Sequence, residues 1–106
     1  MKLTRTQQKV VTRFEEIGGI GWTGTRIVNG KFDLATWARN VKSAFGRSEY
    51  ERATRVRKRL GVNSNGVWCS GATMLRLQEA GIIEPVHQIP GVWRLTTNYK
   101  EKIEAT

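Results

Sequence analysis

Cysteine, histidine and aspartate each occur only once in this sequence of 106 residues, as Cys69, His87 and Asp33. A single cysteine cannot form an internal disulfide, and one cysteine with one histidine cannot complete a zinc site. The glutamates fall at positions expected to be exposed on helices, without the clustered carboxylates and lysine that a metal-dependent nuclease uses. We therefore expect a protein that is not an enzyme, with no metal, no cofactor and no catalytic residue.

Long apolar segments are absent as well. No run is long enough to span a bilayer, and the opening residues MKLTRTQQ lack the apolar core of a secretory signal. A lone cysteine is typical of a reducing compartment. These features together predict a cytoplasmic protein that does not enter membranes.

What the sequence has in excess is positive charge. Eighteen lysines and arginines against nine acidic residues give a formal net charge of +9, with a pI near 10.5. Eleven of the basic residues are arginines, whose planar guanidinium suits bidentate contact with a phosphate or a guanine edge. The excess favours a polyanionic partner such as nucleic acid. The alternative is a basic surface of the ribosomal kind, or one that serves only solubility.

The first two helices are predicted from their caps and apolar spacing. Thr4 and Gln7 fit a capping box for a helix over residues 5–17, whose polar face we expect simply to be solvated. Asp33 is a good N-cap for a second helix that should end at Phe45. The apolar stripe of this second helix includes four large side chains that we expect in the core: Leu34, Trp37, Val41 and Phe45.

Ser48 is the expected cap of a third helix, over residues 49–60. The helix lies in the densest basic stretch of the chain, residues 47–59, where the local charge is +4. Three arginines form a row on one of its faces, which is either a solvated surface or a surface that follows phosphates: Arg52, Arg55 and Arg59.

Between the first two helices, residues 18–32 contain five glycines. Asn29-Gly30 is a turn dipeptide between two short apolar stretches, which predicts a small hairpin or one short strand near Ile27. A glycine-rich phosphate cradle at GGIGWTG is a sharper interpretation, but the lysine and Ser/Thr of a P-loop do not follow it.

The C-terminal third predicts a helix followed by two strands. Ser70 caps a helix over about 70–80 with Met74, Leu77 and Ala80 turned inward, and Gly81 ends it. Residues 82–86 and 92–96 are then predicted to form two short strands, joined by a turn that ends at Gly91.

In this region Leu77–Glu84 (LQEAGIIE) and Gly91–Thr96 (GVWRLT) resemble the winged helix-turn-helix superfamily, and the segment is most similar to the Mrr N-terminal type found attached to restriction endonucleases. Arg59–Val62 resembles the end of a positioning helix, with a polar loop then leading into the recognition helix. The resemblance implies a mainly helical α+β fold for a single domain, 1–106, with a recognition helix over about 70–80 and a small antiparallel β wing over about 82–97. It also implies that the protein binds double-stranded DNA and acts as a transcription regulator.

This interpretation assigns roles to eight residues. Arg76 should contact a guanine or a phosphate in the major groove, with the shorter donors Ser70 and Thr73 beside it. The helical arginines should follow phosphates, and two wing residues should reach the minor groove or the backbone. The full set is Ser70, Thr73, Arg76, Arg52, Arg55, Arg59, Arg94 and Gln88. Trp68 and Trp93 flank the helix and are expected in the core.

Two other classes of function stay open, beside a sharper form of the DNA hypothesis, the reader of modified bases. A small phage-like inhibitor or adaptor of a DNA- or RNA-handling enzyme would expose an apolar patch around Ile89, Pro90 and Val92. A protein that binds structured RNA would expose Trp22 or Trp37 for stacking. A reader of modified bases would carry an aromatic-lined pocket near the recognition helix. The sequence leaves the monomeric or dimeric state undecided.

Overall fold

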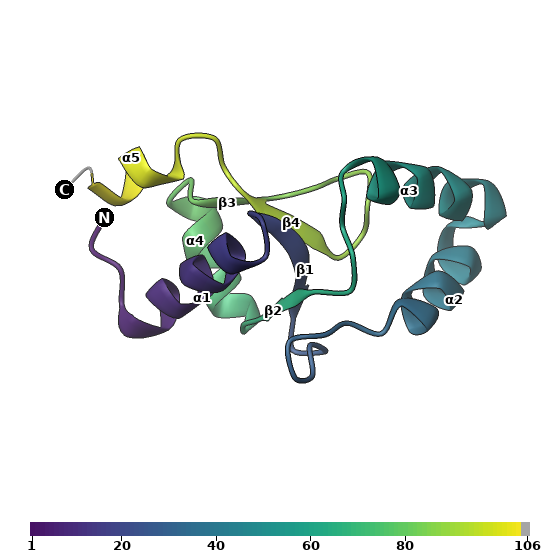
Figure 1. Ribbon diagram of the computed structural model, residues 1–106, viewed down its shortest axis with the longest axis horizontal. Helices are drawn as coiled ribbons and strands as arrows, with labels where there is room; N and C mark the ends of the chain where they lie inside the picture. The colour runs from purple at the N-terminus through teal and green to yellow at the C-terminus, as the bar shows by residue number, and fades with distance from the viewer. Residues whose placement is uncertain (105–106) are drawn as a thin grey trace.

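The structure is a computed structural model that describes residues 1–104 (Figure 1). Within this range the chain has an α+β fold, and about half of the residues are helical. The elements follow in the order α1 (Arg5–Glu16), β1 (Ile20–Gly24), α2 (Leu34–Phe45), α3 (Arg47–Arg59), β2 (Gly66–Trp68), α4 (Gly71–Glu79), β3 (Ile83–Pro85), β4 (Val92–Leu95) and α5 (Tyr99–Glu104).

The four strands form one mixed sheet in the order β2-β1-β4-β3. β1 pairs in parallel with β2, so that Gly24 lies beside Trp68, and pairs antiparallel with β4. β3 and β4 form an antiparallel hairpin with Glu84 opposite Arg94. The predicted C-terminal hairpin is therefore confirmed. The small antiparallel sheet expected of the wing is larger than predicted: the strand that joins it from the segment after α1 is Ile20–Gly24 and does not lie near Ile27, and β2 pairs in parallel on the far side of that strand.

Two clusters of buried side chains hold these elements together. In one, between the sheet and the α2–α3 pair, the Trp22 ring stacks on Phe32 with 4.5 Å between centroids and meets Trp37 edge-on at 5.2 Å. The other joins α1 and α4 to the sheet around the fully buried Phe14 and Leu77. Figure 1 shows α2 and α3 at one end of the sheet and α1, α4 and α5 at the other. The molecule is elongated as a result, with a longest extent of 45 Å.

Three of the predicted helix starts are confirmed by their hydrogen bonds. The Thr4 hydroxyl accepts from the Gln7 amide at 3.1 Å, and the Gln7 side chain accepts in return from the Thr4 amide at 3.0 Å. Asp33 and Ser70 cap α2 and α4 in the predicted way. Short polar side chains at these positions satisfy amides that have no partner inside the helix.

The start of the third helix was predicted wrongly. α3 begins at Arg47, directly after Gly46, which has φ +91° and closes α2 as expected. Gly46 supplies no side-chain cap, and Ser48 lies within the first turn. Because the chain reverses at Gly46, Phe45 lies past the end of the packed stripe and is 61% exposed, whereas Trp37 is buried as predicted.

The glycine-rich segment after α1 does form the predicted turn. Asn29 and Gly30 both have positive φ, 53° and 76°, and Val28 and Lys31 exchange two backbone hydrogen bonds of 3.0 Å across them. Two positive φ values in a two-residue loop are the signature of a type I′ hairpin turn. The segment 20–24 is strand β1, and does not form the loop between a strand and a helix that a phosphate cradle needs.

The helices α3 and α4 do not form the consecutive pair that the sequence predicted. Residues 60–65 lead from α3 into β2, and only then does Ser70 start α4. α3 packs with α2 in the first buried cluster, and α4 packs with α1 in the second. The prediction that a polar loop runs directly from the helix over residues 49–60 into the recognition helix is therefore wrong.

The two ends of the described chain lie side by side (Figure 1). The N-terminal ammonium group of Met1 donates to the carbonyls of Lys102 and Ile103 at 3.0 and 2.9 Å, and the Tyr99 hydroxyl donates to the Glu15 carboxylate at 2.6 Å. Among residues 1–104, no helix has both the length and the apolar character that crossing a membrane requires.

Candidate nucleic-acid interface

Helix α4 presents one predicted contact residue to solvent and uses two others in its own cap. The Ser70 hydroxyl oxygen accepts from the Thr73 amide at 3.2 Å and lies 3.0 Å from the Thr73 hydroxyl. Both side chains are half-buried in this arrangement. Arg76 is exposed on the same helix and has no ion pair within residues 1–104. Of the three α4 residues, Arg76 is the one free to bind an anion.

The arginine row on α3 is partly neutralised. Arg52 forms an ion pair with Glu49 at 2.6 Å, and this hydrogen bond raises the pKa of its guanidinium. Arg55 and Arg59 are exposed and have no acidic partner in the described part of the chain. The guanidinium groups of Arg55 and Arg59 are therefore available to bind a phosphate.

Of the two wing residues, one is ion-paired and the other is not. Arg94 on β4 lies opposite Glu84 on β3, and their side chains form an ion pair at 2.8 Å. Gln88 is exposed in the loop between the strands, where it lines a small pocket of about 180 Å³ together with Arg52 of α3. The structure thus brings Gln88 to the α2–α3 end of the molecule.

The eight predicted residues do not form one continuous site. Ser70, Thr73 and Arg76 belong to the end of the molecule built on α1 and α4. The α3 arginines and Gln88 lie at the other end, and Arg94 lines a pocket beside Tyr99. A polyanion that contacts all of them has to follow the long axis of the molecule.

The exposed features that would favour the other functions are not found where the sequence placed them. Ile89 and Val92 are both 1% exposed, and Pro90 alone of the three is exposed, so these residues do not form the apolar patch expected of an adaptor. Trp22 and Trp37 are buried, and their indole nitrogens donate to the carbonyls of Asn63 and Pro90 at 2.6 and 2.9 Å. Neither ring is available to stack on an RNA base.

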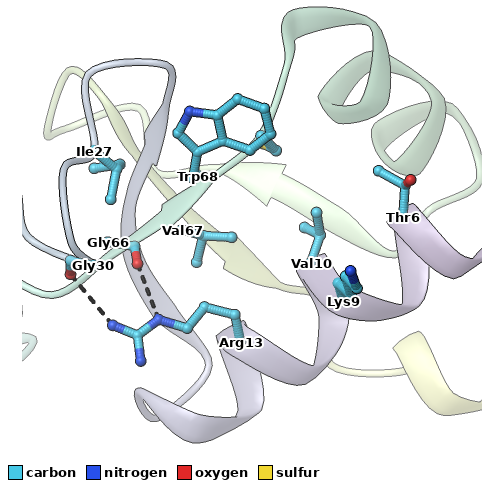
Figure 2. A pocket seen from close by; sticks show the side chains of 10 residues that line it. Thr6, Lys9, Val10, Arg13, Ile27, Gly30, Gly66, Val67 and Trp68 are labelled. Carbon is cyan, nitrogen blue, oxygen red and sulfur yellow. Dashed lines mark hydrogen bonds between the residues drawn. The ribbon is translucent and has the colours of Figure 1, made fainter.

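The sequence reasoning missed a pocket of about 420 Å³ between α1 and β2 (Figure 2). Lys9 and Arg13 line it, and both belong to the polar face of α1 that the sequence predicts to be merely solvated. Trp68, which was expected in the core and is instead 61% exposed, lines it too. The signal was present in the alternation of Val67, Trp68 and Cys69, since neighbouring strand residues face opposite sides of a sheet.

Arg13 fixes one wall of this pocket. Its Nε donates to the Gly66 carbonyl at 3.1 Å and its Nη2 to the Gly30 carbonyl at 3.3 Å, as the dashed lines in Figure 2 show. The side chain also forms a 3.5 Å ion pair with Glu16. Gly30 in turn accepts from the Gly66 amide at 2.9 Å. One guanidinium therefore ties α1 to both the type I′ turn and β2.

The lone cysteine is a buried wall of the same pocket. Cys69 is 1% exposed, and burial raises the pKa of its thiol to about 11. Desolvation penalises the thiolate, the form that attacks electrophiles and binds metals. Within residues 1–104, no three or more His, Cys, Asp or Glu side chains gather where they could hold a metal ion.

No protein family, curated protein or solved structure with which the chain was compared matches it.

Proposed function

We propose that this chain is a non-catalytic protein that binds double-stranded DNA as a winged helix, in the manner of a small transcriptional regulator or DNA reader. In this proposal α4 is the reading helix and the β3–β4 hairpin is the wing. The observation that carries the proposal is the way α4 is joined to the hairpin.

The junction is short and held from both sides. Gly81, which has φ +76°, follows the Ala80 cap of α4, and the Ile82 amide donates to the Leu77 carbonyl at 3.0 Å. The Thr96 hydroxyl, just after β4, donates to the Gly81 carbonyl at 2.6 Å. The returning strand thereby fixes the end of the helix, so that helix and wing are presented to a ligand as one unit.

Within α4 and the hairpin, Glu79 and Glu84 balance the charges of Arg76 and Arg94, so the support for a polyanionic ligand comes from exposed cations that have no acidic partner within residues 1–104. The outer face of α4 carries Arg76, and the neighbouring helix α1 adds the exposed Arg5 and Lys9. We assign Arg76 to the major groove, and Arg55 and Arg59 to phosphates farther along the duplex. The ion pairs of Arg52 and Arg94 with glutamates give these two a smaller part, while Ser70 and Thr73 position α4.

Fluorescence anisotropy with duplex DNA across a salt series down from about 150 mM tests the proposal, because phosphate contacts release counterions and make binding salt-dependent. A chain of charge +9 binds DNA in dilute buffer regardless of function, so the result at physiological salt decides. Saturable binding there, with a log-log slope that corresponds to several phosphates, supports the proposal. Loss of all binding at that salt overturns it and leaves the adaptor function, for which a pull-down is the next experiment.

A further inference from the structure

The indole of Trp68 stands out on the surface of an otherwise well-packed sheet. Its neighbours in sequence, Val67 and Cys69, are each 1% exposed, whereas Trp68 is 61% exposed. Its partner in the parallel strand β1 is Gly24, which has no side chain to cover the ring. One face of a large aromatic ring is thus left without a protein neighbour, at an energetic cost that burying it would remove.

The ring stands at the edge of the pocket between α1 and β2 rather than on a flat surface. Val10, Ile27 and Val67 form apolar walls, and Figure 2 shows Trp68 above them. The volume, about 420 Å³, lies within the range of small-molecule sites in proteins. Arg13 holds the turn at Gly30 against β2, so the walls are fixed before any ligand arrives.

The charge at this pocket has a single sign. Two of its ten lining residues, Lys9 and Arg13, are cationic, and none is acidic. Lys9 is exposed and, within the described residues, its side chain makes neither an ion pair nor a hydrogen bond. An occupant that suits this pocket has a flat aromatic part for the ring and the apolar walls and a negative charge for Lys9.

We propose that the pocket accepts one unstacked nucleobase of the bound DNA, with its ring against Trp68 and its phosphate beside Lys9. Stacking on an aromatic side chain is a general means of holding unpaired bases, and a base that is already unpaired costs least to place there. Cys69, which lines the pocket, lies two residues before Gly71, the first residue of α4. This inference rests on the proposed function, and it adds a preference for duplexes that contain an unpaired base.

The experiment compares two duplexes of identical sequence, one fully paired and one with a single bulged base, at physiological salt. The full-length wild-type protein should bind the bulged duplex more tightly by roughly tenfold to a hundredfold, the range that stacking of one base supplies. Trp68→Ala should bring the ratio of the two affinities close to one and leave binding to the paired duplex unchanged. Trp68→Phe retains an aromatic face and should retain part of the ratio.

Val28→Ala is the matched control, because Val28 is an exposed apolar residue that does not line the pocket. It should leave the ratio intact. Acrylamide quenching gives an independent readout: Trp22 and Trp37 are buried and Trp93 is half-buried, so the exposed Trp68 dominates the quenching, and the bulged duplex should shield it. If the wild type binds both duplexes equally, or Trp68→Ala keeps the ratio, the pocket assignment is wrong while duplex binding stands. If the wild type binds neither duplex, both proposals fail together.

Discussion

The Nε of Arg13 donates a hydrogen bond of 3.1 Å to the backbone carbonyl of Gly66, 53 residues farther along the chain. The same guanidinium reaches the Gly30 carbonyl at 3.3 Å. One side chain therefore links three segments distant in sequence, namely α1, the type I′ turn and β2. The side chain is 34% exposed, so it is partly shielded from solvent while its charge remains close to the surface.

We predict that Arg13→Ala lowers the free energy of unfolding by about 1–3 kcal/mol, because it removes two hydrogen bonds from a charged donor to partly buried carbonyls. Urea denaturation monitored by circular dichroism measures this change. Lys9→Ala is the matched control: Lys9 lies one turn earlier on the same helix, and its replacement should change stability by less than about 0.5 kcal/mol. Equal effects of the two substitutions would show that the Arg13 hydrogen bonds contribute nothing.

Gly66 provides a second test of how closely these segments approach. A Cβ at Gly66 would overlap the side chain of Ile27 and would lie 3.2 Å from the Trp22 carbonyl oxygen. We predict that Gly66→Ala destabilises the protein by about 1–3 kcal/mol through overpacking. Gly71→Ala is its counterpart, since a Cβ there meets nothing within 4 Å, and it should be neutral or stabilising by up to about 1 kcal/mol. Thermal unfolding of both variants provides the comparison, and a neutral Gly66→Ala would contradict the close approach of Ile27.

The features of the fold that depend on nearby residues could be predicted from the sequence. The caps at Thr4, Asp33 and Ser70 and the stop at Gly81 all lie within a few residues of the bonds they make. The turn at Asn29-Gly30 is equally local, because only these residue types accept positive φ readily at both positions.

The features that the sequence did not reveal depend on pairings between distant segments. β2 is three residues long and is a strand because β1, more than 40 residues earlier, pairs with it in parallel. Without that strand, α3 and α4 look like neighbours, and Trp68 looks like a core residue. The ion pair of Arg94 could not be predicted either, because the register of the hairpin is what places Glu84 opposite it.

The buried thiol leads to a prediction about reactivity. Burial raises the pKa of Cys69 from 9.0 to about 11, so at pH 8 the folded protein should contain roughly a hundredfold less thiolate than an unfolded chain. We expect labelling by a disulfide reagent to be slower in the native protein by at least this factor, and to become fast in urea. Rapid labelling under native conditions would contradict the burial of Cys69.

The same shift predicts a dependence of stability on pH. Because folding raises the pKa of Cys69, the folded state favours the neutral thiol. The resulting stabilisation is complete below the unfolded pKa of 9.0 and is lost as pH rises through about 11. The free energy of unfolding should therefore decrease as the pH rises between these two pKa values. For Cys69→Ala it should decrease less steeply. Parallel slopes for the two proteins would show that other groups account for the alkaline loss.

The roles given to two exposed arginines differ in a way that binding measurements separate. Arg76 lies on α4, where it would read bases, and Arg55 lies on α3, where it would contact phosphate. We predict that Arg76→Ala weakens binding to a preferred site by about 1–3 kcal/mol and reduces discrimination between sequences. Arg55→Ala should weaken binding to all duplexes alike and lower the salt slope by about one unit. Anisotropy titrations of a preferred and a scrambled duplex over a salt series measure both effects. If the two variants behave identically, α4 is not the reading helix, and the positive charge of the protein acts on DNA without regard to its sequence.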